Sequence, residues 1–235
     1  MTMADPLQMT LLARLNTWRR GLHDWLHADL TTPGNRRKAR IYTLWYDHEL
    51  VRIPWSNFAR VAEGVYRSNQ PTKARFRRWQ RKLGLKTVLS LRGQTGAPPI
   101  LEEEAICAEL GLRLESCALS ARQAPPRERI LELIALFPRL EKPFLMHCKS
   151  GADRASLASA IYLLTQENAS VEEAQKMLSP RFVHLKFTRT GILDHILEAY
   201  AARNAASPIA FADWIAQDYD AAALQAEFDT KRGRA

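Results

Sequence analysis

The sequence predicts an α/β protein with a mainly parallel central sheet flanked by helices and with extra helices at both ends of the chain. Short apolar segments alternate with longer segments of helical periodicity from about residue 60. The connections are short, and residues 87–91 are uncharged and mostly apolar, which is typical of a strand buried on both faces. With 235 residues, 46% of them hydrophobic, the chain is long enough for a well-buried core.

The first predicted element is an amphipathic helix over residues 6–30. Its apolar face is formed by Leu11, Leu15, Trp18, Leu22 and Trp25. A break at 31–35, a basic run at 36–40 and an aromatic segment at 41–58 follow. Two interpretations are open: the helix lies in the interface of an anionic membrane, or its apolar stripe packs on the body of the protein.

The α/β alternation begins with a short strand or hairpin over 61–67, centred on Glu63 and Gly64. A basic helix over 72–83 ends at Gly84. Further strands are expected at 87–91, 112–117 and 144–147, and further helices at 100–110, 127–137, 153–166, 170–178, 190–203 and, as an Ala-rich pair, 208–228. We therefore expect an N-terminal extension over 1–58, one α/β domain over 59–205 and a C-terminal helical extension over 206–235.

Charge and composition narrow the class of partner. The net charge is +9, and the first 100 residues hold 18 Lys and Arg against 6 Asp and Glu, which favours an anionic partner or a solvated basic face. No stretch is apolar enough to span a membrane, no export signal precedes the domain, and three cysteines suit a reducing compartment. We expect a cytoplasmic protein, peripheral to membranes if residues 6–30 bind lipid, with no specific nucleic-acid partner.

The segment 147–154, His-Cys-Lys-Ser-Gly-Ala-Asp-Arg, predicts an anion site. A cysteine follows an apolar strand, and an arginine six residues later opens a helix. The backbone N–H groups of such a loop can cradle a phosphate at the helix N-terminus, and Gly151 permits the torsions that this requires. Thiolate is favoured in this setting, and Arg154 can grip two phosphate oxygens.

This segment resembles the CX5R signature of the cysteine-dependent protein tyrosine and dual-specificity phosphatases. The segments 65–71, 85–93 and 191–194 are similar to bacterial dual-specificity-like members, so the resemblance covers about residues 60–200. It implies that Cys148 attacks phosphorus to form a thiophosphate, while Arg154 and the amides of Lys149, Ser150, Gly151, Ala152 and Asp153 bind the phosphoryl oxygens. It also implies that His147 orders the loop, and that neither a metal nor another cofactor is needed.

Two departures from the family pattern stand out. Ala155 occupies the position that usually carries Ser or Thr, and Ser156 is the candidate to replace that hydroxyl. No carboxylate lies between Cys117 and Pro125, where the family carries its general acid. Asp153 is the candidate replacement, as in the loops of myotubularin-like lipid phosphatases, and its alternative role is to complement the helix dipole. Glu115 and Glu128 flank the vacant position and are weaker candidates.

Other residues expected near the opening of the anion site are candidates for supporting roles in substrate binding. Lys149, Arg92 and Arg122 could contact an anionic substrate, and each could equally be a solvated charge. Surface roles are favoured for Arg181, His184 and Lys186, structural roles for Asp194 and His195, and inert packing for Cys107 and Cys117.

Three functional hypotheses follow. The first is a phosphatase of phosphotyrosine or phosphoserine/threonine in proteins. The second keeps the chemistry but takes a phosphorylated lipid or glycolipid head group at the membrane surface, which the N-terminal helix and the basic half favour. The third is a pseudophosphatase that binds phosphorylated partners without turnover, which the missing acid and Ala155 favour.

Overall fold

The computed structural model describes residues 54–93 and 96–233. The predicted helix at 6–30 and most of the aromatic segment at 41–58 lie outside the described residues. Five strands form one sheet in the order β1-β2-β5-β3-β4. They are β1 (Ala59–Ala62), β2 (Val65–Ser68), β3 (Thr87–Ser90), β4 (Arg113–Ser116) and β5 (Phe144–His147). Only the β1–β2 hairpin is antiparallel, so the predicted mainly parallel sheet is confirmed.

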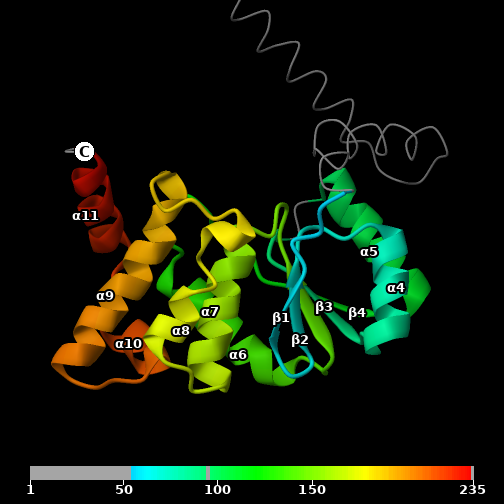
Figure 1. Ribbon diagram of the computed structural model, residues 1–235, viewed down its shortest axis with the longest axis horizontal. Coiled ribbons are helices and arrows are strands. Elements are labelled where there is room, and N and C mark those ends of the chain that lie inside the picture. The colour runs from blue at the N-terminus through cyan, green and yellow to red at the C-terminus, as the bar shows by residue number, and fades with distance from the viewer. Residues whose placement is uncertain (1–53, 94–95, 234–235) are drawn as a thin grey trace, which may run out of the picture. The chain divides into compact units, whose positions relative to one another are not determined.

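Helices connect the strands and follow the last of them (Figure 1). The connecting helices are α4 (Lys73–Leu83), α5 (Pro98–Leu110) and α6 (Arg127–Leu136), the last followed by the 3-10 turn η2 (Phe137–Arg139). The chain continues through α7 (Arg154–Gln166), α8 (Val171–Gln175), η3 (Pro180–Phe182), η4 (Arg189–Gly191), α9 (Ile192–Ala206), α10 (Phe211–Gln217) and α11 (Ala221–Gly233). Among the described residues, no helix is long and apolar enough to cross a membrane.

Side chains alternate between the two faces of the sheet, as strand geometry requires. Leu89 and Met146 join the larger core with α6, α7 and the helices after them. Val88 and Leu145 point the other way and join a smaller core with α4 and the end of α5. Both faces of the central strands are therefore covered, and every residue of β3 and β5 is buried.

Local signals account for most element boundaries. Thr72 caps α4 through its side chain, and Gly84 ends the helix with φ 66°. The hairpin turns at Gly64, which has φ 70°. The helix expected at 170–178 is shorter, because α8 stops at Gln175 and Ser179 is extended before Pro180.

The C-terminal helices share the larger core with the sheet. Phe211, Trp214, Tyr219, Leu224 and Phe228 are buried in it. The expected division at residues 205 and 206 stays a prediction.

The parallel strands end at a single edge of the sheet. His147 pairs with Ser68 on one side and with Ser90 on the other, and Ser90 pairs with Ser116. The segments that leave these four strands therefore start side by side. In open α/β sheets, this carboxyl edge is where ligands bind.

Candidate active site

Cys148 is the first residue after β5 and lies at the floor of the loop that leads into α7. Its side chain is 1% exposed, and the backbone N–H of Gly151 donates a hydrogen bond to its Sγ atom over 3.2 Å. The 148–154 loop thus turns back over the sulfur, as an anion cradle requires. All three cysteines are free. Burial raises the pKa of the Cys117 thiol to about 11, which fits an inert packing role.

Backbone contacts hold the 148–154 loop against the segment that follows β2. Gly151 has φ 73°, and a Cβ atom there would come within 2.8 Å of the backbone of Ser68 and Asn69. The backbone N–H of Gln70 donates to the carbonyl of Lys149 over 3.2 Å. Only glycine fits at position 151 without displacing this neighbour.

Asn57 fastens the same loop from a second direction. Its amide nitrogen donates to the carbonyls of Ser150, over 3.2 Å, and Phe182, over 3.0 Å. The side chain therefore joins the 148–154 loop to η3. Nothing in the local sequence around Asn57 indicates this role, because both partners are about a hundred residues away.

Arg67 lies buried beneath the loop and was not singled out from the sequence. Its guanidinium donates to the Gly151 carbonyl, to Ser156 Oγ over 2.9 Å and to the Met177 carbonyl over 3.4 Å. Its Cζ atom lies 3.9 Å from the centre of the Phe182 ring. Burial lowers the pKa of Arg67 to about 10, against the opposing effect of Cys148 and Asp153. Arg67 therefore remains a cation at neutral pH and supplies fixed positive charge under the loop.

Ser156 lies below the loop. The residue is fully buried, and its hydroxyl contacts the Ala152 carbonyl and Arg67. These contacts brace the loop from the first turn of α7. The expected part of Ser156 in hydrolysis of the intermediate stays a prediction.

Arg154 is the first residue of α7, and its side chain is partly exposed. Its Nη1 atom lies 3.4 Å from the carbonyl of Leu91. The same carbonyl accepts the backbone N–H of Leu119 over 3.4 Å. Arg154 therefore reaches the carboxyl edge of the sheet, where the segments after β3 and β4 meet.

Asp153 begins a chain of hydrogen bonds that the sequence did not predict. His184 Nδ1 lies 2.8 Å from Asp153 Oδ1, and His184 Nε2 lies 2.7 Å from Asp194 Oδ2. Burial of the imidazole opposes its charge, but the bonds to Asp153 and Asp194 outweigh it and raise the pKa of His184 to about 9. At neutral pH His184 is therefore an imidazolium that donates to both carboxylates. Asp153 makes no side-chain capping bond to α7.

These hydrogen bonds correct the role expected for one of the residues between η3 and η4. A surface role was expected for His184, yet its side chain is 1% exposed. Lys186 does lie at the surface, where it pairs with Glu198. A His flanked by two Asp residues at distant positions has no recognisable spacing, so the sequence offered no signal for it.

Four other predicted residues lie in or beside the 148–154 loop. His147 is fully buried, and its Nδ1 lies 3.5 Å from the Cys148 carbonyl, which fits a role in ordering the loop. Lys149 and Ser150 are partly exposed. Arg92 donates to Gln70 Oε1 over 3.0 Å and so lies beside the segment that supports the loop.

The segment after β4 carries Arg122 where the family has its acid. Arg122 is exposed and lines a cavity together with residues of α11. Glu115 is paired with Arg113, and Glu128 lies in the first turn of α6. Asp153 is thus the only carboxylate that the described residues place within the 148–154 loop itself.

The sequence of this chain matches a known protein family. A family model described as "DSP-PTPase phosphatase fused to NAD+ Kinase" matches residues 56–189, more than half of the chain. The chain belongs to this family. It is a phosphatase of the dual-specificity-like cysteine phosphatase superfamily. No curated protein matches it.

Solved structures are similar to this phosphatase at low identity. TpbA of P. aeruginosa has a TM-score of 0.50 and 21% identity, with 75% of this chain and 92% of TpbA covered. TpbA in complex with pTyr has a TM-score of 0.49, 20% identity and coverage of 74% and 90%. The catalytic core of the PP-IP phosphatase SIW14 from S. cerevisiae has a TM-score of 0.46, 22% identity and coverage of 65% and 94%. At 21% identity, the likeness to TpbA concerns the fold alone.

Proposed function

We propose that this phosphatase hydrolyses phosphomonoesters of the phosphotyrosine or dual-specificity type through a thiophosphate on Cys148. The observation that carries the proposal is the 3.2 Å hydrogen bond from the Gly151 N–H to Cys148 Sγ. It supports a loop already folded around the sulfur, with Arg154 at the start of α7. A phosphate bound there would meet backbone donors, a guanidinium and the helix N-terminus together.

The first step transfers the phosphoryl group to sulfur. The Cys148 thiolate attacks phosphorus, the S–P bond forms and the bond from phosphorus to the leaving oxygen breaks. Arg154 and the loop amides hold the phosphoryl oxygens through the transition state. In the second step, water attacks phosphorus, the S–P bond breaks and the thiolate is restored.

We assign the proton of the leaving oxygen to Asp153 together with His184. His184 Nδ1 passes its proton to Asp153 Oδ1, 2.8 Å away, and Asp153 delivers a proton to the leaving oxygen, which leaves His184 neutral. The proton that water loses in the second step returns to the same pair. Because the raised pKa of His184 keeps it charged at neutral pH, the pair carries this proton before the reaction begins.

The leaving group tests this assignment. Replacing Asp153 with Asn should lower kcat by about 10²–10⁴-fold for an alkyl phosphate, whose oxygen needs a proton, and much less for p-nitrophenyl phosphate. Steady-state kinetics on both esters measure the difference. An equal loss on the two would contradict the role of Asp153 as the acid.

A second candidate function is dephosphorylation of a lipid or glycolipid head group. It is favoured by three exposed apolar side chains, Val183 at 50%, Leu185 at 40% and Phe187 at 80%. Val183 and Leu185 are the sequence neighbours of His184, which contacts Asp153 of the 148–154 loop, and Phe187 follows three residues later. Exposed apolar side chains beside a site indicate an apolar partner. Val183, Leu185 and Phe187 would therefore suit the hydrocarbon part of an amphiphilic phosphoester.

One experiment tests the reaction and separates the two substrates. Phosphate release by the wild type and by Cys148→Ser is measured on a phosphotyrosyl peptide and on a phosphorylated lipid in mixed micelles. We expect release on the peptide that the serine variant abolishes. Release on the lipid alone, weakened by Phe187→Ser, would select the second candidate. Binding without release on either would instead point to a pseudophosphatase.

A further inference from the structure

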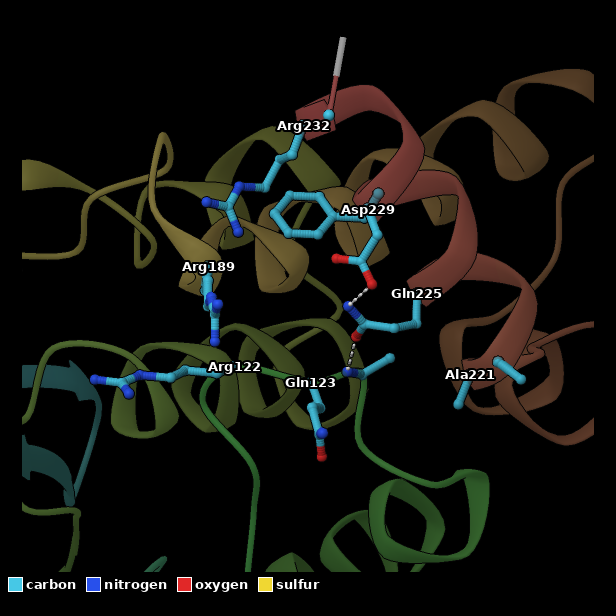
Figure 2. Close-up of a pocket in the computed structure, with 11 residues that line it drawn as sticks. Arg122, Gln123, Arg189, Ala221, Gln225, Asp229 and Arg232 are labelled. Atoms are coloured by element: carbon cyan, nitrogen blue, oxygen red, sulfur yellow. Dashed lines mark hydrogen bonds between the residues drawn. The ribbon is translucent and has the colours of Figure 1, made fainter. Parts of the chain in front are cut away.

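A cavity of about 800 Å³ lies between the segment that follows β4, η4 and the C-terminal helix α11 (Figure 2). Three of its lining residues are arginines, one from each element: Arg122, Arg189 and Arg232. Figure 2 shows the Arg189 side chain pointing toward Arg122, with Arg232 on the same side of the cavity. The mechanism proposed above uses neither Arg189 nor Arg232.

No carboxylate neutralises these arginines within the part of the chain that the structure describes. None of the three takes part in an ion pair among residues 54–93 and 96–233, and Arg232 only approaches the Phe228 ring, at 5.8 Å. The cavity does hold one acid, Asp229, whose Oδ2 accepts a hydrogen bond from Gln225 Nε2 over 3.1 Å. Three guanidiniums against one carboxylate leave an excess of positive charge that favours an anion.

The walls of the cavity are fastened to each other. Gln225 Oε1 accepts the backbone N–H of Ala124 over 2.9 Å, which joins α11 to the segment after β4. His195 of α9 lies 3.3 Å from Glu227 of α11. The backbone that carries the arginines is therefore already ordered, which lowers the entropy cost of binding a ligand.

Two of the segments that bring arginines to the cavity lie next to residues of the 148–154 loop. Leu119 shares the Leu91 carbonyl with Arg154, and Arg122 follows three residues later, so its Cα is at most about 11 Å from that of Leu119. Arg189 lies in the segment that His184 ties to Asp153. The segments 119–122 and 184–189 therefore lead from contacts with the 148–154 loop to the cavity, and a ligand that spans both would follow this path.

We propose that the cavity between Arg122, Arg189 and Arg232 binds a second anionic group of the substrate. This inference rests on the proposed function, because the 148–154 loop takes the phosphate that is cleaved. The substrate class is then a molecule with at least two phosphate or comparable anionic groups. Such a molecule is either soluble, with the second anion on the same phosphomonoester, or the head group of a multiply phosphorylated lipid.

The test compares ligands that differ only in the second anion. Binding to full-length Cys148→Ser is measured by calorimetry for a series of linear alkanediol bisphosphates of increasing length and for the matching alkanol monophosphates. We expect a bisphosphate of one length to bind at least about 10-fold more tightly than its monophosphate, with an advantage that added salt weakens. Arg189→Gln and Arg232→Gln, added to the serine variant, should bring this ratio close to one.

Arg139→Gln is the matched control, because Arg139 is an exposed arginine on η2, away from the cavity. It removes the same charge and should keep the ratio. Equal affinities for bisphosphate and monophosphate at every length would overturn the proposal, as would an equal loss of the ratio in the Arg139 control.

Two further binding measurements distinguish a lipid head group from a soluble ligand as the source of the second anion. Tighter binding to vesicles of phosphatidylcholine with phosphatidylinositol bisphosphate than to phosphatidylserine vesicles of equal charge would support the site with a lipid occupant. Tight binding of free inositol trisphosphate would support it with a soluble one. Because binding is measured without turnover, failure of the proposed phosphatase reaction would appear separately, as absent hydrolysis of p-nitrophenyl phosphate by the wild type.

Discussion

At the scale of single residues, the 148–154 loop depends on groups that carry no reacting atom. Arg67 donates to Gly151 and Ser156 from below, and Asn57 donates to Ser150 from the side. Backbone donors can act on a developing charge only if they already point at it. We infer that these side chains preserve the direction of the loop amides, and Gly151 is the position where this can be tested most directly.

Gly151→Ala should destabilise the protein and impair catalysis. The new Cβ would lie 2.8 Å from the backbone of Ser68 and Asn69, and φ 73° is strained for any side chain. We expect a loss of about 1–3 kcal/mol in the free energy of unfolding. Displacing one donor from the transition state should also lower kcat by about 10²-fold.

The matched control is Gly84→Ala at the end of α4. Gly84 has φ 66°, but a Cβ atom there would meet nothing within 4 Å. It should lose stability through backbone strain alone and retain kcat. Urea denaturation and kinetics on p-nitrophenyl phosphate compare the two variants, and an equal loss of kcat in both would argue against the proposed role of Gly151.

Because of His184, both the stability and the activity of the protein should fall as the pH becomes alkaline. Its folded pKa of about 9 lies above the ordinary 6.5, so protonation stabilises the fold. This contribution is fully present below about pH 6.5 and is lost as the pH rises through about 9. It is worth on the order of 3 kcal/mol, at about 1.4 kcal/mol per pKa unit.

We therefore expect the free energy of unfolding of the wild type to fall between pH 6.5 and 9 more steeply than that of His184→Gln. In the wild type, kcat for an alkyl phosphate should decline over the same interval, as the pair loses its proton. Denaturation and kinetics at matched pH values measure both. Parallel pH profiles for the wild type and the variant would show that His184 causes neither pH dependence.

At the scale of elements, the C-terminal helices are fastened to the segment that replaces the usual acid loop. The Tyr219 hydroxyl donates to the Pro125 carbonyl over 2.7 Å, and Arg127 donates to the carbonyls of Ala216 and Tyr219. Burial raises the pKa of Tyr219 above its ordinary value, so the hydroxyl keeps its proton. The segment 118–126 is thus supported by the end of the chain.

Tyr219→Phe should cost about 1–3 kcal/mol in the free energy of unfolding, because the buried Pro125 carbonyl loses its donor. Tyr66→Phe is the control, since Tyr66 is partly buried and its hydroxyl makes no hydrogen bond within residues 54–93 and 96–233. Urea denaturation of the two variants checks the prediction. Equal stability of the two would show that the Tyr219 bond contributes little.

At the scale of the whole molecule, the sequence predicted the sheet and the anion loop better than the network around the loop. Strand and helix periods are local, and the CX5R spacing lies within seven residues, so both can be read directly. The contacts of Arg67 with Ser156 and of His184 with Asp153 join residues 89 and 31 positions apart. Both pairs form only when distant segments of the chain come together in the fold, so no local pattern announces them.

The central claim is that Cys148 carries the phosphoryl group during turnover. Rapid acid quenching of the wild type with p-nitrophenyl phosphate, followed by mass spectrometry of its peptides, tests this most directly. We predict one phosphoryl group on the peptide that contains Cys148, and neither adduct nor turnover in Cys148→Ser. Turnover at the wild-type rate in Cys148→Ser, or a phosphoryl group on another residue of the wild type, would contradict it.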